Sequence, residues 1–597
     1  GNPNLGEVRS MLMAVENTGL ETACAEVWFN ELRFSNLDED GGWAATGRVD
    51  ITLADLGRIT VSGSARSAGF GTLEQRVNER SREDVYNIDV AANIDAGKLL
   101  PKRALLQIPV YAGYSRMVST PEYDPFDLDI KYRDKIRAAN AADRDSIKAQ
   151  AQDVTTIKTV NFTNVKKLLK PGKKPQLWSL SNFDVSYSYI NTTRYNPLIE
   201  HEELERTRAA LGYNYMIQPK FVEPFKRLIK SNSKWLTFIK EFNFNYLPSQ
   251  LSFKADVYRQ FGAIRPRNIG GGKYKIPETY DKYFTFDRYY ILQWDLTKSI
   301  NINFNATNYA RIDEPFGRID TKEKKDSVRS NLFKGGRNTQ YLQDLTIGYR
   351  LPTEKFPLLD WTTGRFTYKT SYNWLAASLL ARELGNTLSN TQTRTFNAEL
   401  NFEQLYSKNR FLRAVNSEPQ PRNPNSKGQN GVAPDQPATP KVKAPPIVIT
   451  DSMRATMSKK EIRKYIRKAK KEARRAAREE RRREREVRRN QPMELNGVVR
   501  AVGGVLTSVK RVGIDYSQEF GTTLPGYMDS TRVMGANLKS GQPGFGFIFG
   551  YQPDTSWINN FGARGLLSTD AMLTSMIQQR YNERLSITGQ LSPIRDL

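Results

Sequence analysis

The sequence predicts a large all-β protein built from many long strands. Apolar and polar residues alternate with a period of two in many segments, which is typical of strands with one buried face. The segments run for about 9–12 residues, close to the length that a tilted strand needs to cross a bilayer, whereas strands in soluble sheets average about five or six. Many apolar faces carry Tyr or Trp toward one end, as the aromatic girdles of membrane barrels do. These observations favour a transmembrane β-barrel, although a soluble β-sandwich would also alternate.

The stretch FTYKTSYNW, residues 366–374, shows the alternation without interruption. Successive side chains of a strand point to opposite faces, so its large residues share one face and its polar residues share the other. The apolar face contains Phe366, Tyr368, Thr370, Tyr372 and Trp374. Arg365 and Lys369 belong to the opposite face. The open question at this point is whether protein or lipid covers the apolar face.

The same pattern locates the other strands in order along the chain. It begins with a hairpin in which residues 49–53 and 59–61 flank a turn at Gly57. The later strands are expected at residues 86–94, 106–114, 183–189, 207–215, 292–296, 300–306, 345–349, 396–400, 514–520, 545–551 and 585–591. The pattern therefore predicts about fourteen to sixteen strands.

Stretches of different composition interrupt the strands. Residues 131–152 are rich in Ala and charged residues, which predicts a helical insert, and residues 417–446 contain eight prolines and no aromatic residue, which predicts disorder. The expected organisation is a lead-in segment at 1–40 that is periplasmic or close to the barrel, barrel strands with loop insertions at 41–416, a disordered Pro-rich linker at 417–450, a basic charged helix at 451–490, and barrel strands at 491–597.

The formal net charge of +26 invites a nucleic-acid-binding interpretation. However, the stretch from Lys459 to Arg489 holds 17 basic and 6 acidic residues, so 11 of the 26 excess charges lie in 31 residues. Acidic and basic residues recur there at helical spacing, as in an exposed, solvated helix. A solvated spacer helix explains the charge better than an arm that binds nucleic acid or anionic lipid.

Several kinds of chemistry find little support. With one cysteine, Cys24, and one histidine, His201, the chain can form neither an internal disulfide nor a four-ligand Cys/His zinc site. His201 stands in an acidic, turn-like stretch and is expected at the surface. The mean hydropathy of −0.60 and the absence of a run of about 18 apolar residues argue against a spanning helix. Because a membrane barrel needs only alternate apolar residues, the low mean does not exclude a membrane.

The glycine-rich and acidic stretches do not complete known motifs. AGFGTLEQR has Glu74 where a dinucleotide fingerprint requires Gly, and IGGGKY has Tyr274 where a P-loop has Ser or Thr. Asp38, Glu39 and Asp40 resemble a calcium loop but lack its later bidentate Glu. We therefore expect no catalytic, cofactor-binding or metal-binding residue, and we predict that the protein is not an enzyme.

Several long strings resemble one family. They are GNPNLGEVRSMLMAVEN, CAEVWFNELRFSNLDEDGGWAATGRVDITLADLG, GYNYMIQPKFVEPFK, KEFNFNYLPSQLSF, YFTFDRYYILQWDLT, NYARIDEPFGRIDTKEKKDS and FGTTLPGYMDS. In this order they are similar to the SprA/Sov family, the giant outer-membrane translocons of the type IX secretion system in Bacteroidota, which are also called gliding-motility proteins. Residues 417–490 are the least similar part.

The resemblance implies a function and partners. It implies one exceptionally large antiparallel barrel in the outer membrane, of which this chain forms a part, because family members are several times longer. It also implies a channel that passes folded cargo proteins with a C-terminal secretion signal to the cell surface. The implied partners are a PorV-type shuttle barrel at a lateral opening and a periplasmic plug protein, with no cofactor and no nucleic acid.

A barrel also implies a face for each site residue. We expect Phe366, Tyr368, Thr370, Tyr372 and Trp374 to face lipid, and Arg365 and Lys369 to face the lumen. Two other functions remain open from the residues alone: another giant outer-membrane transporter, for lipopolysaccharide or a nutrient, or a soluble β-rich nucleic-acid-binding protein.

Overall fold

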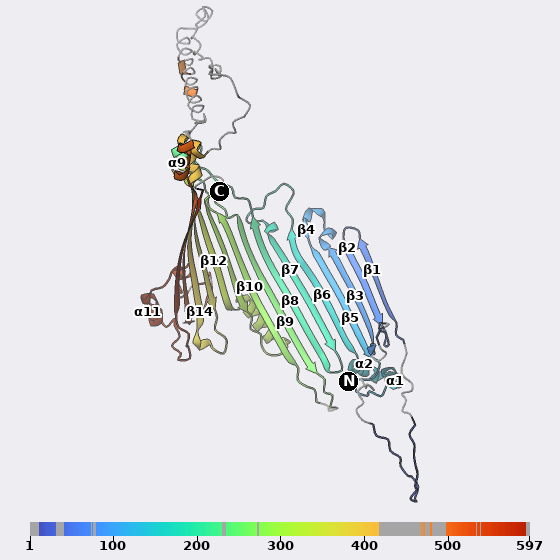
Figure 1. Ribbon diagram of the computed structural model, residues 1–597. Coiled ribbons are helices and arrows are strands. Elements are labelled where there is room, and N and C mark those ends of the chain that lie inside the picture. The colour runs from blue at the N-terminus through green and yellow to red at the C-terminus, as the bar shows by residue number, and fades with distance from the viewer. Residues whose placement is uncertain are drawn as a thin grey trace, which may run out of the picture.

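The computed structural model describes residues 11–30, 41–416 and 497–592, apart from gaps at 73, 76–78, 230–233, 271–273, 533 and 538, together with six residues between 467 and 479. The described strands form one sixteen-stranded sheet in which each long strand pairs with the next along the chain (Figure 1). All pairings are antiparallel. The predicted all-β fold is therefore confirmed, with a sheet that is not closed among these residues.

The long strands have between 10 and 19 residues. They are β1 (Ala44–Leu53), β2 (Gly57–Arg66), β3 (Glu83–Asp95), β5 (Pro109–Pro121), β6 (Asp153–Lys167), β7 (Phe183–Tyr195), β8 (Ile199–Met216), β9 (Gln250–Pro266), β10 (Thr279–Asp295), β11 (Ile300–Arg311), β12 (Arg337–Leu351), β13 (Thr362–Leu375), β14 (Asn386–Asn401), β15 (Val509–Tyr527) and β16 (Gln578–Leu591). The two-residue β4 (Leu106–Gln107) pairs with β6 beside β5.

The helices lie in the connections between strands. They are α1 (Tyr132–Ala138), α2 (Ala141–Ala151), α3 (Thr237–Lys240), α4 (Lys322–Phe333), α5 (Phe402–Lys408), α6 (Arg410–Asn416), α9 (Gly497–Leu506), α10 (Phe545–Ile548) and α11 (Thr555–Ala563). Short 3-10 helices are η3 (Ala96–Leu99), η4 (Lys102–Ala104), η5 (Leu180–Asn182), η6 (Lys234–Leu236), η7 (Thr353–Lys355) and η8 (Arg382–Leu384). Within the described part of the chain, no helix is both long enough and apolar enough to cross a membrane.

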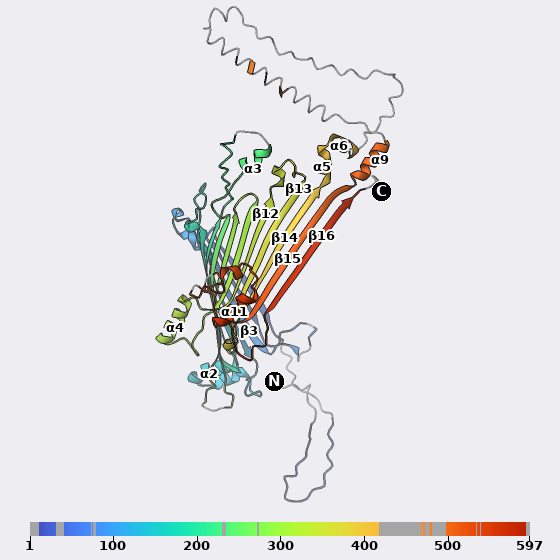
Figure 2. The ribbon, with the colours of Figure 1, turned by 90° about the vertical axis from the view of Figure 1, so that its left-hand side faces the viewer.

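Because the sheet is a simple meander, its connections alternate between two ends. We call them the α4 end, where β1 begins and where α1, α2, α4, α10 and α11 lie, and the α9 end, where α3, α5, α6 and α9 lie. The sheet is strongly curved, and the two views together place α4 and α11 on its convex side (Figures 1 and 2). The concave side faces the viewer in Figure 1.

The main apolar core lies between the sheet and the connection from β15 to β16. We call this connection, residues 528–577, the covering segment. The core contains Ala306, Tyr341, Tyr372, Trp374, Leu388, Leu524 and Tyr527 from β11 to β15, and Ala536, Phe547, Ile548 and Phe561 from the covering segment.

Three local expectations are corrected by the structure. Residues 545–551, expected as a strand, contain helix α10, so the predicted strands at 491–597 reduce to β15 and β16. His201, expected in a turn, lies within β8. The strands are mostly longer than expected, since β9 and β10 have 17 residues each.

The predicted segments outside the sheet are described to different extents. The helical insert 131–152 contains α1 and α2. The lead-in 1–40 is described at 11–30, which contains no helix or strand. The predicted linker 417–450 lies outside the described residues, as does most of the predicted basic helix 451–490. The six residues described there are Arg467, Lys470, Lys471, Arg474, Arg478 and Glu479, which are helical and exposed.

Candidate functional site: a two-faced sheet and the segments that cover it

The strand register shows which side chains share a face of the sheet. Residues directly opposite each other in an antiparallel pair point to the same side. Tyr290 pairs with Ala306, Ala306 with Gln343, and Gln343 with Tyr372. This face is the convex one, because α10 packs on Tyr372 and lies in the same covering segment as α11.

The convex face carries exposed apolar side chains, which we call the apolar belt. Its members are Val49, Ile51, Tyr86, Ile88, Tyr114, Val160, Val185, Tyr187, Leu211, Tyr290, Phe366, Leu585 and Ile587. On β8, β10, β13 and β16 the belt lies in the half nearer the α9 end. So many exposed apolar side chains on one face are unusual for a soluble protein and indicate contact with another apolar phase or partner.

The concave face is polar along its length. One row of paired residues crosses seven strands, from β10 to β16, without an apolar side chain. The row contains Gln293, Asn303, Thr346, Lys369, Thr393, Glu519 and Asn582. One buried charge on this face is paired: Asp256 on β9 accepts hydrogen bonds from the guanidinium of Arg208 at 2.8 and 2.5 Å and lies 3.0 Å from the ammonium of Lys254.

The covering segment packs on the convex face nearer the α4 end. Tyr372 is fully buried, its hydroxyl donates to the carbonyl of Gly535 at 3.1 Å, and its ring lies perpendicular to that of Phe547 with centroids 6.2 Å apart. The indole of Trp374 donates to the carbonyl of Asp529 at 3.2 Å. These contacts tie the segment to β13 through both apolar packing and hydrogen bonds.

The expectation of lipid contact is therefore wrong for three of the five side chains. Thr370, Tyr372 and Trp374 have 1%, 0% and 2% of their surface exposed, because protein covers them. Tyr368 also meets the covering segment, since its hydroxyl donates to the carbonyl of Phe549 at 2.6 Å. Phe366, 37% exposed, belongs to the belt, and its contact with lipid stays a prediction.

Arg365 and Lys369 lie on the opposite, concave face of β13, where both are exposed. The structure thus separates the predicted lumen residues from the predicted lipid-facing residues onto two faces. That the concave face borders a lumen stays a prediction.

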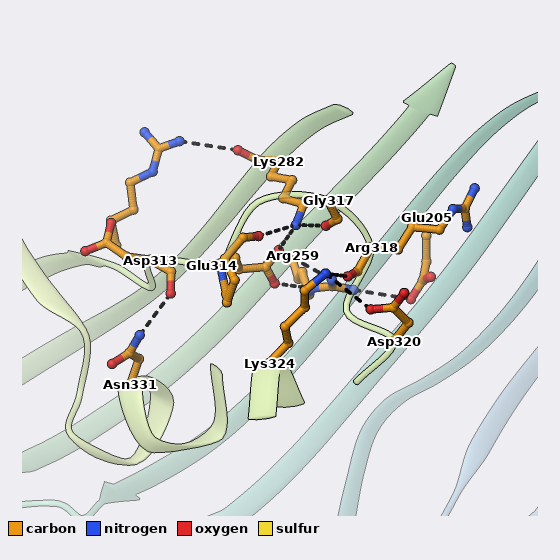
Figure 3. Close-up of polar contacts among 12 residues, drawn as sticks. Glu205, Arg259, Lys282, Asp313, Glu314, Gly317, Arg318, Asp320, Lys324 and Asn331 are labelled. Atoms are coloured by element: carbon orange, nitrogen blue, oxygen red, sulfur yellow. Dashed lines mark hydrogen bonds and ion pairs between the residues drawn. The ribbon is translucent and has the colours of Figure 1, made fainter. Parts of the chain in front are cut away.

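A second group of contacts closes the convex face at β8 to β10. The connection from β11 to β12, residues 312–336, folds back over these strands, as Figure 3 shows. Its Glu314, whose side chain is 3% exposed, accepts from the guanidinium of Arg259 at 2.6 Å and lies 3.7 Å from the ammonium of Lys282. Lys282 also donates to the carbonyls of Pro315, at 2.7 Å, and Gly317. A carboxylate of the loop thereby pairs with two cationic side chains of the sheet.

Arg318 fixes the same loop nearer the α4 end. Its guanidinium contacts Glu278 at 2.8 Å and Glu203 at 2.9 Å. The hydrogen bonds from Arg318 hold the pKa of Glu278 at about 2, well below its ordinary value, and these same contacts raise the pKa of Arg318. The pair is therefore ionised at neutral pH and clamps the loop.

The covering segment and Glu314 were missed by the sequence analysis. The sequence did contain a usable signal for the segment, namely closely spaced glycines in and just before it, which favour turns over a strand. They are Gly526, Gly535, Gly541, Gly544 and Gly550, and in the structure all five have positive φ angles. No comparable signal identified Glu314, because its partners come from other strands.

The motifs that the sequence analysis weighed are only partly described. Asp38, Glu39 and Asp40, together with Gly272 and Lys273, lie outside the described residues. Among the residues that are described, no group of three His, Cys, Asp or Glu side chains is placed to hold a metal ion.

Residues 1–136, which include β1, β2, β3 and β5, match the family model SprA_N, described as a motility related/secretion protein. This match supports the resemblance of the chain to the SprA/Sov family. No curated protein matches the chain. The match indicates a protein related to motility or secretion, and the large sheet is compatible with a place in the outer membrane.

Proposed function

We propose that this chain forms part of the wall of an outer-membrane channel that passes folded proteins with a C-terminal secretion signal to the cell surface, in type IX secretion and gliding motility. The observation that carries the proposal is the opposition of an apolar belt on the convex face to a polar row across seven strands on the concave face. Such alternation is what a barrel with a lipid-facing exterior and a water-filled lumen requires.

The strand lengths support this arrangement. A strand tilted in a bilayer needs about 9–11 residues, whereas β9 and β10 have 17. The surplus extends beyond the membrane, where convex-face side chains need another cover. The covering segment and the 312–336 loop supply that cover at the α4 end, so the part of the sheet that borders the hydrocarbon is the belt.

The proposed channel acts as a conduit and not as an enzyme. A wall of amide, hydroxyl and balanced charged groups stays hydrated and offers a passing protein little apolar surface to which it could adhere. A PorV-type shuttle barrel and a periplasmic plug protein are the proposed partners, and the family match to secretion proteins supports this setting.

Depletion of the protein in its native cell tests the proposal. Cargo with the C-terminal signal should then accumulate in the periplasm in a folded, protease-resistant form, while lipopolysaccharide and other outer-membrane proteins still reach the surface. Surface proteolysis and fractionation measure both. Loss of surface lipopolysaccharide while signal-bearing proteins still leave the cell would favour a different transporter and contradict the proposal.

A further inference from the structure

Phe333, at the end of α4, is an apolar side chain that is 83% exposed. Two residues after it, the carbonyl of Gly335 accepts from the guanidinium of Arg288 at 3.3 Å. Arg288 lies two residues from Tyr290, a belt residue on the same face of β10. The C-terminal end of α4 therefore stands at the border between the belt and the protein-covered half of the sheet.

The position of Phe333 is set by the way α4 is held. Val328 and Leu332 are half-buried on the inner side of the helix, and the amide of Asn331 donates to the carbonyl of Asp313 at 2.9 Å. At the start of α4, the ammonium of Lys324 donates to the carbonyl of Arg318 at 2.9 Å. With both ends tied to the loop, the helix presents Phe333 outward.

The covering segment presents aromatic residues at the same border on β13. The hydroxyl of Tyr368, the neighbour of belt residue Phe366 on the same face, donates to the carbonyl of Phe549 in the turn after α10. In that turn and in α10, Phe545 is 54% exposed and Tyr551 is 52% exposed. Two loops far apart in sequence thus project aromatic rings where the belt ends.

Basic side chains accompany the aromatic ring on α4. Arg329, with 70% of its side chain exposed, lies one turn before Phe333, and Lys334 follows it. Arg329 also pairs with Asp326 at 3.7 Å, an exposed contact that leaves most of the guanidinium open to solvent. Aromatic rings with adjacent Lys or Arg are the combination that binds the interface of a bilayer, where rings enter the headgroup layer and cations meet phosphates.

We propose that α4 and α10 are membrane-surface anchors. In this proposal, which rests on the proposed membrane position of the belt, Phe333, Phe545 and Tyr551 enter the headgroup layer of the leaflet that borders the belt toward the α4 end. Arg329 and Lys334 contact its phosphate groups. The two loops then rest on the lipid surface and fix the position of the sheet along the membrane normal.

Site-specific fluorescence quenching tests the anchors. In a Cys24→Ser background, single cysteines replace Phe333 and Phe545, carry an environment-sensitive dye, and are placed in nanodiscs of phosphatidylglycerol brominated near the headgroup end of the acyl chains. Val185→Cys on the belt is the positive control, and Lys369→Cys on the concave face is the negative control. Lys322→Cys lies on the same helix, eleven residues or about 16 Å from position 333, and serves as a matched control.

The anchors predict loss of fluorescence at positions 333, 545 and 185, and little loss at 322 and 369. Quenching at 185 without quenching at 333 and 545 would overturn the anchors while leaving the membrane position of the belt intact. Absence of quenching at 185 as well would contradict the proposed function itself. Replacing phosphatidylglycerol with phosphatidylcholine should weaken quenching at 333, because the membrane surface then has no net negative charge to attract Arg329 and Lys334.

Discussion

Tyr372 illustrates how single side chains hold the covering segment on the sheet. Its ring is in contact with Phe547 and Tyr341, and its hydroxyl meets the carbonyl of Gly535. This hydrogen bond matters for stability because a buried hydroxyl without a partner is unfavourable. Two substitutions of Tyr372 can therefore separate the contribution of the ring packing from that of the hydrogen bond.

Tyr372→Ala should destabilise the packed covering segment by about 3–5 kcal/mol, as the removal of other large buried aromatic side chains does. Tyr372→Phe keeps the ring and removes only the hydrogen bond, so the expected loss is about 1 kcal/mol. Hydrogen exchange of residues 528–577 measures both. Lys369→Ala, on the opposite face of the same strand, is the control, and equal effects of the three variants would show that the segment does not depend on Tyr372.

The Glu278–Arg318 pair gives the 312–336 loop a predictable response to acid. Because the pKa of Glu278 is lowered from 4.5 to about 2, its contribution to stability is complete above about pH 4.5 and is lost as the pH falls through about 2. Hydrogen exchange of the loop, corrected for the intrinsic effect of pH, should therefore increase over this window. Glu278→Gln should remove that part of the response, and an unchanged profile in this variant would assign it to other carboxyl groups.

At the scale of elements, the long connection between β14 and β15 leaves the sheet and returns to the same place. Val415 near the end of α6 is 3% exposed, and a Cβ atom on Gly503 of α9 would lie 2.7 Å from its side chain. The two helices that flank residues 417–496 are therefore packed closely together. The connection between them is not required to bring β14 and β15 together.

We predict that replacing residues 417–490 with a short Gly/Ser linker leaves membrane assembly intact, because a connection is most easily shortened where the elements on both sides of it pack together. Heat-modifiable migration and membrane fractionation measure assembly. Gly503→Leu is the contrasting variant, since its side chain would collide with Val415 and should impair the packing of α6 against α9. Failure of the deletion with retention of function in Gly503→Leu would contradict this prediction.

The residues of α10 show why one predicted strand was wrong. Phe545, Phe547, Phe549 and Tyr551 alternate with other residues as in a strand, but Gly544 and Gly550 have φ angles of 89° and 97° and bound a single helical turn. Gly550 lies against Thr370 and Gln392, where a Cβ atom would be 3.3 and 3.1 Å away. The close approach of loop and sheet decides this local structure. The alternation of apolar and polar residues in the sequence gives no sign of such an approach.

At the scale of the whole molecule, the two faces of the sheet predict opposite responses to the same substitution. Phe366 and Thr367 are neighbours on β13, the first in the belt and the second on the concave face. Phe366→Arg should cost up to about 2–4 kcal/mol, the value for a cation at the bilayer midplane, and Thr367→Arg should cost little. The free energy of unfolding in lipid vesicles measures the difference. Equal costs for the two variants would show that lipid does not border Phe366.

The sequence by itself determined the all-β class and the division of most strands into two faces. It did not identify β6 and β9, which the structure adds to the sheet. Alternation at residues 366–374 correctly separated Arg365 and Lys369 from Tyr372 and Trp374, because strand geometry sends successive side chains to opposite sides. The helical insert at 131–152 followed from local composition, whereas the ends of the strands did not.

Only the tertiary structure decided what covers each part of the apolar face. Phe366 and Trp374 occupy equivalent positions in the alternation, yet Phe366 is 37% exposed and Trp374 is 2% exposed beneath the covering segment. Protein and lipid exclude an apolar side chain from water equally well. The apolar alternation in the sequence therefore shows which side chains avoid water, but not whether protein or lipid covers them. That material is set by residues 155 or more positions away, such as Asp529 and Phe547, whose approach depends on the packing of the whole segment.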